Sequence, residues 1–575
     1  MDKINLKIDG IQVSVPKGTT ILQAAKEYKV NIPTLCFMQG VHEPGSCRIC
    51  VVEVEGWRGL QPACVTKVEE GIVVKTAGKL VRETRKELLE LILANHNREC
   101  LSCARNQKCE LQKLAEDFGV SSVSYEKKAA RAEMDEWGPI VRDSSKCILC
   151  GRCVSICSNT QKVNAIEIAQ RGAHTTVTTP YEEALSGRSC INCGQCIKIC
   201  PVGALQERDD SDKVWSALED PELHVVVQTA PAVRVALGEE FGLPVGINVR
   251  GKMVTALRRL GFDKVFDTTF SADLTIMEEG TELLQRIQQG GKLPLITSCS
   301  PGWVKFCEHN FTDFLDNLSS CKSPQQMFGA VAKSYYPQKA GLDPKKIFVV
   351  SVMPCTAKKY EADREEMMVQ GRKDVDAVIT TRELAKMIKQ AGINFNDLED
   401  SGYDELLGTS TGAGVIFANT GGVMEAALRT VADILTGQDL EAIEYSAVRG
   451  FEGIKEATVH IDGLEIKAAV VHGTGNAAQL LDRIREGTAN YHFIEVMGCP
   501  GGCINGGGQP ILMDKSRTQE VNRLRAAGIY ALDRQAVKRK SHENPEIKKI
   551  YEEYLEKPGS HRSHELLHTH YVARS

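Results

Sequence analysis

The sequence lacks any apolar run that approaches the length of a membrane span. Its first residues, MDKINLKIDG, are charged and alternating, so we expect no signal peptide there. It also lacks an excess of either charge: 70 Lys and Arg against 75 Asp and Glu leave a net charge of −5, which gives no reason to expect nucleic-acid binding. Its 575 residues are too many for one core, so about three to five domains are expected.

Cysteine, by contrast, is abundant. The chain has 21 cysteines, an odd number that argues against a disulfide framework in the absence of an export signal. Fifteen lie within the first 200 residues, and the other six lie between Cys299 and Cys503. This clustering indicates metal sites, and the reducing cytoplasm is the expected compartment for so many thiolate ligands.

Residues 1–78 form the first predicted domain. An alternating segment crosses an Asp9-Gly10 turn, which is typical of a β-hairpin, and TTILQAAKEY follows as a helix with Thr at its N-cap. Its cysteines have the spacing C-x10-C-x2-C-x13-C, which favours a plant-type 2Fe–2S cluster. Zinc is the alternative, but zinc sites prefer paired C-x2-C knuckles and only one pair is present. The predicted ligands are Cys36, Cys47, Cys50 and Cys64.

Residues 79–125 are predicted to be helical and to contain a second site, and the polar residues 126–140 are predicted to be a connector. The segment HNRECLSCARNQKC offers one imidazole and three thiolates, which suit either zinc or a 4Fe–4S cluster. We favour iron because iron–sulfur sites are predicted on both sides; an ordinary helix-surface histidine is the alternative for His96. The predicted ligands are His96, Cys100, Cys103 and Cys109.

Residues 141–208 contain an internal repeat, two runs of C-x2-C-x2-C-x3-C. This is the spacing of bacterial two-cluster ferredoxins, in which the fourth cysteine of each run ligates the other cluster. One predicted 4Fe–4S site therefore consists of Cys147, Cys150, Cys153 and Cys200, and the other of Cys190, Cys193, Cys196 and Cys157.

Residues 209–575 alternate apolar strands with amphipathic helices, an α/β pattern, and carry the remaining motifs TSCSPGW, VMPCTAKK and EVMGCPGGCINGGGQP. With these motifs the chain resembles the iron-only (FeFe) hydrogenases of the large clostridial type, which have four accessory clusters. The resemblance extends from the 2Fe–2S module to the C-terminal segment RKSHENPEIKKIYEEYLEKPG.

The resemblance implies a multidomain α+β and α/β fold. Its parts are a β-grasp 2Fe–2S module, a helical His/Cys 4Fe–4S module, a two-cluster ferredoxin module and an α/β hydrogenase catalytic domain. It also implies an H-cluster: a 4Fe–4S cubane joined to a di-iron unit with CO, cyanide and a dithiolate. By motif, Cys355, Cys499 and Cys503 are cubane ligands, and Cys503 also bridges to the di-iron unit.

The resemblance further assigns roles around the di-iron unit. Cys299 matches the proton-donating thiol; Glu279, Ser319 and Glu282 match the relay to solvent, with Arg286 at its outer end. Lys358 matches a lysine that contacts cyanide. The residues that match those packing around the unit are Met353, Met497, Gln325, Phe417 and Pro231. Spacing alone would instead place Glu279 and Glu282 on a solvated helix face.

One residue departs from the family pattern at a cubane ligand. Ser300 stands where the fourth cysteine is expected, and a hydroxyl oxygen is a harder ligand than a thiolate. Three outcomes follow: Ser300 ligates through oxygen, the cubane loses an iron, or Cys299 takes the ligand role. Cys307 and Cys321 are nearby candidates for recruitment, although ordinary buried thiols are the favoured interpretation. Ala232 stands where some relatives have serine near a cyanide, a change expected to tune the site.

Two further motifs match the patterns of other protein classes, a zinc protease and a dinucleotide-binding protein, but their context argues against both functions. HELLH, from His564 to His568, matches a zinc-protease pattern but lies close to the C-terminus, with little chain left to build a cleft. HGTGNAA follows a strand as dinucleotide-binding turns do, but no ribose-binding acid follows, so a packing turn is predicted.

The resemblance implies a hydrogenase that reversibly converts protons and electrons to H2. The implied partners are ferredoxin or flavin- and NAD-binding subunits as electron carriers, and maturation proteins that deliver the di-iron unit; no nucleic-acid or membrane partner is expected. Two rival functions remain: an electron-transfer subunit like the large iron–sulfur subunit of NADH dehydrogenases, which explains only the first 200 residues, and a hydrogenase-like sensor or assembly protein, which only Ser300 supports.

Overall fold

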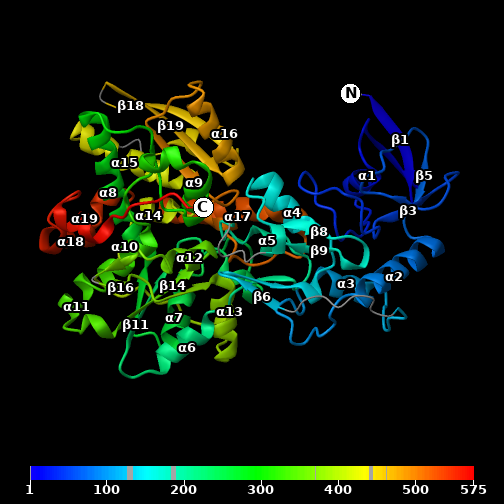
Figure 1. Ribbon diagram of the computed structural model, residues 1–575, viewed down its shortest axis with the longest axis horizontal. Helices are drawn as coiled ribbons and strands as arrows, with labels where there is room; N and C mark the ends of the chain where they lie inside the picture. Colours follow the sequence, from blue (N-terminus) through cyan, green and yellow to red (C-terminus); the bar gives the residue numbers. More distant parts are fainter. Residues whose placement is uncertain are drawn as a thin grey trace.

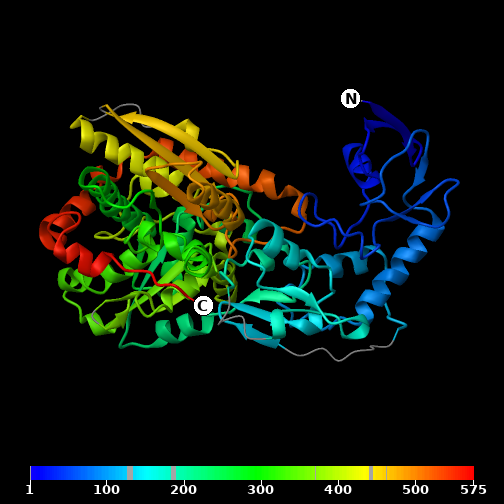
Figure 2. The same ribbon diagram turned by 45° about the horizontal axis from the view of Figure 1, so that its top comes forward.

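The computed structural model describes residues 2–125, 134–182, 189–369, 371–438, 444–461 and 463–574. Figure 1 shows an elongated molecule: the N-terminal module at one end, a small cysteine-rich module in the middle and a large α/β domain at the other end. Figure 2 shows the same order from a second direction. Within the described residues, no helix combines the length and apolarity needed to cross a membrane.

The N-terminal module is a mixed five-stranded sheet packed on one helix, as predicted for a β-grasp fold. Its strands lie in the order β2-β1-β5-β3-β4. The first hairpin turns at Asp9 and Gly10, both with positive φ (49° and 84°), as a tight turn between twisted strands requires. Thr20 forms a capping box with Gln23 at the start of the helix, so the predicted N-cap is confirmed. The elements are β1 (Lys3–Ile8), β2 (Ile11–Pro16), α1 (Ile21–Glu27), β3 (Val51–Val54), β4 (Gln61–Pro62) and β5 (Val73–Lys75).

Two helices follow, α2 (Lys79–Ala94) and α3 (Glu110–Asp117), as the sequence predicts for this region. Of the predicted connector, residues 126–133 lie outside the described residues. Its last part departs from the prediction, because residues from position 134 onward form a hairpin that pairs with a strand after the second cysteine run. The three strands are β6 (Met134–Trp137), β7 (Ile140–Asp143) and β10 (Leu205–Glu207).

The central module repeats one local structure twice, as the cysteine repeat predicts. Each run leads into a short helix, α4 (Arg152–Ser155) or α5 (Gln195–Ile199). The residue before each helix is a glycine in the left-handed conformation, Gly151 with φ 75° and Gly194 with φ 68°.

The catalytic domain is built on two four-stranded sheets, with strand orders β12-β11-β14-β17 and β13-β20-β19-β18. The first sheet is entirely parallel, and β18 pairs antiparallel with its neighbour in the second. Because the carboxyl ends of parallel strands meet at one edge, the loops that follow them can share one site. The strands are β11 (His224–Thr229), β12 (Lys264–Asp267), β13 (Leu295–Ile296), β14 (Ile347–Met353), β17 (Ala377–Thr380), β18 (Ile454–Ile461), β19 (Leu464–His472) and β20 (Phe493–Met497).

A long buried helix, α8 (Thr268–Gln289), follows β12 and carries the predicted proton-relay glutamates. Asp267 caps it by accepting a hydrogen bond from the Thr269 backbone N–H and pairs with Arg234 at 2.6 Å. Both partners of this pair are fully buried, and removal of one would leave an uncompensated charge at a cost of about 3–5 kcal/mol. The pair therefore fixes where α8 begins.

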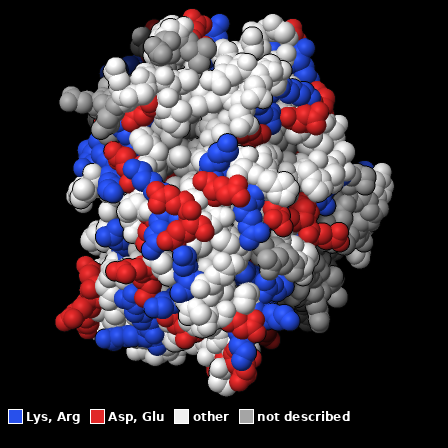
Figure 3. Space-filling model, turned by 90° about the vertical axis from the view of Figure 1, so that its left-hand side faces the viewer, with Lys and Arg blue, Asp and Glu red and all other residues white. Residues whose placement is uncertain are grey.

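The C-terminal segment returns across the catalytic domain. It comprises α17 (Thr518–Gln535), α18 (Pro545–Ile550) and α19 (His561–Leu567). Figure 1 shows α18 and α19 at the end of the molecule farthest from the N-terminal module. Figure 3 views the molecule from that end and shows acidic and basic side chains interspersed across the face. A mixed surface of this kind does not favour a strongly charged partner there.

Candidate functional site

The four thiols predicted to hold the 2Fe–2S cluster come together in the N-terminal module. The sulfurs of Cys50 and Cys64 lie 3.3 Å apart. The thiols of Cys36 and Cys47 also contact each other, and this contact lowers the pKa of Cys36 to about 5. The residues sit on loops beside the sheet, which leaves the sulfurs free to face one another.

The second predicted site follows α2. Two backbone N–H groups point at its sulfurs: Gln112 N–H donates to Cys109 Sγ at 3.4 Å, and Arg105 N–H donates to Cys103 Sγ at 3.5 Å. Such donors stabilise thiolates, which are the form that ligates iron. His96 is only partly exposed and follows the last turn of α2.

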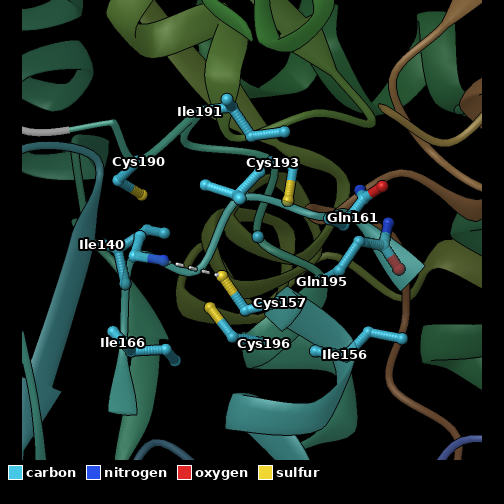
Figure 4. Close-up of a pocket in the computed structure, with 13 residues that line it drawn as sticks. Ile140, Ile156, Cys157, Gln161, Ile166, Cys190, Ile191, Cys193, Gln195 and Cys196 are labelled. Carbon is cyan, nitrogen blue, oxygen red and sulfur yellow. Dashed lines mark hydrogen bonds between the residues drawn. The ribbon is translucent and has the colours of Figure 1, made fainter. Parts of the chain in front are cut away.

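The structure brings each ferredoxin-type set together around a cavity, with the fourth cysteine of each run beside the first three of the other run. One cavity is lined by Cys147, Cys150, Cys153 and Cys200. A second cavity is lined by Cys157, Cys190, Cys193 and Cys196, and Figure 4 shows these four sulfurs directed toward one space. Burial raises the pKa of Cys190 to about 11 and that of Cys193 to about 12.

Residues of both N-terminal cysteine sites contact residues around the Cys150-containing cavity. The ring of His42, on the 2Fe–2S loop, lies 2.7 Å from the carbonyl oxygen of Cys150, and the Arg152 guanidinium donates to the Cys36 carbonyl at 3.3 Å. From the other side, the sulfur of Cys103 would lie only 2.5 Å from a Cβ at Gly203, so glycine is required for this approach. The 2Fe–2S site and the Cys103-containing site therefore approach the Cys150-containing site from two sides, as two branches.

The second cavity adjoins the catalytic domain. A Cβ at Gly507 would clash with the carbonyl oxygen of Cys193, and the Thr356 hydroxyl donates to the Asn192 carbonyl at 2.6 Å. The glycine-rich run after Cys503 is thus what lets the ferredoxin-like module approach the catalytic site closely.

The thiols predicted to hold the cubane come from loops far apart in the sequence. Cys355 follows β14 and Cys499 follows β20, and their thiols contact each other. Cys503 is close enough to Cys355 to feel its charge, although burial is the main reason that its pKa rises to about 12. A Cβ at Gly502 (φ 93°) would lie 2.7 Å from the Thr420 nitrogen. Glycine at this position therefore lets the loop that carries Cys503 pack closely against the backbone of residues 418–420.

Ser300 faces this group. It occupies the N-cap position of α9 (Pro301–Asn310) but makes no capping hydrogen bond. Instead its Oγ accepts a hydrogen bond from the Gly498 backbone N–H at 3.0 Å, next to Cys499. The hydroxyl thus points to the place where the family pattern expects a thiol. The alternative thiols are fully buried: Cys307 lies further along α9, and Cys321 lies between η7 (Thr312–Asn317) and α10 (Pro324–Ala332).

Lys358 is held over Cys299 by three acceptors. Its Nζ donates to the Cys299 carbonyl at 3.1 Å, to Ser323 Oγ at 2.8 Å and to the Glu361 carboxylate at 2.8 Å. Glu361 also accepts from Gln325 at 3.0 Å. Among the described residues, the buried Gln325 Oε1 has no hydrogen-bond partner, so the site retains a polar atom that can bind a further group.

Glu361 was not anticipated from the sequence. It lies three residues after Lys358 on the same helix, α12 (Ala357–Ala362), and this spacing typically produces an ion pair. That spacing is a local signal and would have identified it.

The predicted relay residues lie near one another, from the Cys299 thiol, which feels the charge of Glu279, to Arg286 at the partly exposed end. Burial raises the pKa of the Cys299 thiol well above its usual range, so it stays protonated. Burial and the charge of Glu282 raise the pKa of Glu279 to about 8. The Ser319 hydroxyl donates to Glu282 at 2.9 Å, and Glu282 pairs with Arg286 at 2.6 Å. The solvated-face interpretation is wrong for Glu279, whose exposed fraction is 2%.

The remaining predicted site residues line the apolar walls around these groups. Cys299 and Cys503 pack against the core cluster that contains Met497, Phe417 and Ala232. All five predicted packing residues are buried: Pro231, Gln325, Met353, Phe417 and Met497.

The residues of the two further motifs, HELLH and HGTGNAA, make packing and surface contacts. In HELLH the rings of His564 and His568 stack at 4.0 Å, while Glu565 pairs with Arg562 on the helix surface. In HGTGNAA a Cβ at Gly475 would lie 2.5 Å from the Thr160 carbonyl, so the predicted packing turn is confirmed.

The fold and site define a multidomain iron–sulfur oxidoreductase whose cluster modules lead to one buried catalytic centre. Family models match along the chain: a 2Fe–2S iron-sulfur cluster binding domain over residues 1–79, an NADH-ubiquinone oxidoreductase-G iron-sulfur binding region over 85–124 and an NADH-quinone oxidoreductase subunit 3 ferredoxin-like domain over 138–206. The C-terminal domain of the iron only hydrogenase large subunit matches 223–507, and the iron hydrogenase small subunit matches 519–574.

Two relatives match nearly the whole chain, and a solved structure matches part of it. The NADP-reducing hydrogenase subunit HndD of Solidesulfovibrio fructosivorans is 49% identical over 591 residues, covering 100% of both chains. Iron hydrogenase 1 of Clostridium pasteurianum is 46% identical over 568 residues, covering 98% of this chain and 99% of that one. An apo FeFe-hydrogenase HydA1 variant from Chlamydomonas reinhardtii is 42% identical, covers 64% of this chain and 100% of its own, and superposes with a TM-score of 0.58.

The chain belongs to the iron-only hydrogenase family and is a hydrogenase with 2Fe–2S and 4Fe–4S accessory domains. The rival electron-transfer function explains only the first third of it, because the hydrogenase domains cover the rest.

Proposed function

We propose that this hydrogenase converts protons and electrons to H2, and the reverse, at an H-cluster held by Cys355, Cys499, Cys503 and Ser300. The bound cluster would supply the redox chemistry at which H2 forms or is split. The observation that carries the proposal is the contact between the Cys355 and Cys499 thiols, with Cys503 nearby and Ser300 hydrogen-bonded beside Cys499, on loops that follow three different strands. The buried, unpartnered Gln325 Oε1 supports the fit, because it leaves a polar atom available to a bound group.

The residues around the cluster hold and move protons. The Cys299 thiol is kept protonated by burial, so it can hand a proton inward. Glu279 can restore that proton because its raised pKa, about 8, keeps it neutral in a dry pocket. Ser319, Glu282 and Arg286 continue the series to the partly exposed outer end. Lys358 places a cation beside the anionic cluster.

Electrons would travel through four accessory clusters, one 2Fe–2S and three 4Fe–4S. The contact between the Cys193 loop and Gly507 makes the Cys190-containing cluster the one nearest the catalytic site. The contacts of Cys150 with His42, and of Gly203 with Cys103, supply two entry branches. With two entry branches, more than one electron carrier could exchange electrons with the protein.

The carriers we propose are ferredoxin or partner subunits with flavin and NAD(P) sites. The second alternative is favoured by the 49% identity to a subunit of an NADP-reducing hydrogenase. We place the protein in the cytoplasm, because a reducing compartment keeps so many thiolate ligands available for clusters. Maturation proteins would deliver the di-iron unit.

The test is H2 evolution by anaerobically matured protein with reduced ferredoxin, reduced viologen or NADPH as the donor. We expect H2 from the first two and none from NADPH unless partner subunits are added. Absence of H2 with every donor, in protein whose accessory clusters are intact, would contradict the proposal and favour a non-catalytic hydrogenase-like protein.

A further inference from the structure

A second group of metal-ligating side chains lies beside the outer end of the proposed proton path. Among the described residues, Glu282, Cys321 and His568 bring a carboxylate oxygen, a thiol and an imidazole nitrogen within 4.8 Å of one another. The Cys321 sulfur is 3.9 Å from Glu282 Oε2. Cysteine and histidine here come from segments far apart in the sequence, so the group is a product of the fold.

The backbone fixes two of the three residues together. Cys321 and His568 form an antiparallel bridge. On either side of it, Lys322 N–H donates to the Leu567 carbonyl at 2.7 Å, and Thr569 N–H donates to the Ser320 carbonyl at 2.7 Å. The C-terminal segment is therefore held as a short strand against residues 320–322, and the thiol and imidazole are placed in advance.

His568 also has the surroundings of a metal-binding imidazole. Its Nε2 lies 3.1 Å from Glu278 Oε2, and Glu278 is itself held by the Tyr551 hydroxyl at 2.5 Å and the Gly559 N–H at 2.9 Å. A carboxylate on one ring nitrogen orients the other nitrogen toward a metal. That other nitrogen, Nδ1, contacts only the Ser320 hydroxyl, at 2.8 Å, among the hydrogen bonds of the described chain.

We propose that Glu282, Cys321 and His568 form a binding site for a borderline-soft divalent cation, with Zn²⁺ as the best match. One sulfur, one nitrogen and one oxygen suit zinc, whereas Mg²⁺ and Ca²⁺ require oxygen ligands. Three protein ligands leave a fourth position for water. Binding converts the Cys321 thiol to a thiolate and releases one proton to solvent. The Glu282 and His568 side chains are 14% and 7% exposed, which gives the ion a route from the surface.

Occupation of this site would inhibit the enzyme. Glu282 is the acceptor of the Ser319 hydroxyl and the partner of Arg286, so a cation on its carboxylate removes the group that passes protons between them. This consequence rests on the proposed function, whereas the binding site itself does not. The rates of H2 evolution and H2 uptake would both fall, because both reactions need proton transfer through the Glu282 carboxylate.

The experiment adds one equivalent of Zn²⁺ to the mature, cluster-loaded protein and records zinc K-edge X-ray absorption and H2 evolution. The variants are Cys321→Ala and His568→Gln. Cys307→Ala is the matched control, because Cys307 is an equally buried thiol of the same domain that lies outside the group. Mg²⁺ serves as the control cation.

For the unaltered protein and Cys307→Ala we expect one sulfur at about 2.3 Å from zinc and nitrogen or oxygen at about 2.0–2.2 Å. Cys321→Ala should lose the sulfur, and both variants should require at least about tenfold more Zn²⁺ for half-inhibition. A sulfur shell that persists in Cys321→Ala would overturn the site. Zinc bound with this sulfur shell but without loss of H2 evolution would support the site and contradict the proton path.

Discussion

The accessory modules and the catalytic domain hold their cysteines in opposite ways. In the ferredoxin-like module, each cavity takes three cysteines from one short run and a fourth from its twin, so local spacing determines the site. In the catalytic domain, Cys355 and Cys499 touch although they follow different strands of two different sheets. The first kind of site can be recognised from the chain alone, and the second exists only once the sheets have formed.

The largest expected effect comes from the catalytic side of this comparison. Cys503→Ala removes the proposed bridging thiolate, so H2 evolution should fall to background, while electron paramagnetic resonance of the accessory clusters stays unchanged. Retention of a tenth of the activity would show that Cys503 does not bridge the two parts of the cluster.

Glu279→Gln tests the proton path without removing a ligand. A glutamine keeps the shape but cannot exchange the proton, so H2 evolution should fall about 10²- to 10⁴-fold. The control is Glu486→Gln, an exposed glutamate at the end of α16 (Thr474–Arg485), which should leave the rate unchanged. Equal rates for the two variants would remove Glu279 from the path.

The pH profile gives an independent view of the same residue. Burial raises the pKa of Glu279 to about 8, so the carboxyl is neutral and able to donate below that pH and ionised above it. H2 evolution should therefore fall about tenfold per pH unit above pH 8 and lose this break in Glu279→Gln. A profile that is flat to pH 10 would contradict the raised pKa.

The Ser300→Cys variant tests how well a hydroxyl serves at a cubane position where the family pattern has a thiol. We expect the variant to hold the cubane iron more completely and to gain about tenfold in H2 evolution, equivalent to about 1.4 kcal/mol of barrier. Iron analysis per chain and the cubane signal in maturase-free protein provide the measurement. No change in either would mean that the oxygen already serves as well as sulfur.

The smallest effect is expected at the N-terminal end. Cys64→Ala should remove the 2Fe–2S signal but lower viologen-linked H2 evolution less than tenfold, because the His96-containing branch also reaches the Cys150 cluster site. H/D exchange, which needs only the catalytic centre, should not change. A loss of H/D exchange would contradict the separation of the two regions.

Most of the local structure of the accessory modules, residues 1–208, was predictable from the sequence alone. The Asp9-Gly10 hairpin, the Thr20 cap and the exchanged fourth cysteines all appear as expected, because turn chemistry, capping and ligand spacing are local. The hairpin at 134–143 was missed because the polar composition of 126–140 suggested a connector. Its pairing with β10, about 60 residues later, leaves no mark in the local sequence.

The catalytic site was predictable only through family resemblance. Periodicity placed Glu279 on a solvated face, but tertiary packing buries it on α8. The anchoring of Lys358 by Glu361 had a local signal, the three-residue spacing on one helix. The juxtaposition of Cys321 with His568 had none, because it depends on where the C-terminal segment docks.

An infrared spectrum of anaerobically prepared, maturase-treated protein in the CO and CN⁻ stretching region tests whether the catalytic centre is assembled. We expect sharp bands, which would mean that the centre forms with Ser300 among its ligands. An absence of bands in protein whose accessory clusters are intact would contradict the proposed function, because the serine would then have prevented assembly of the catalytic centre.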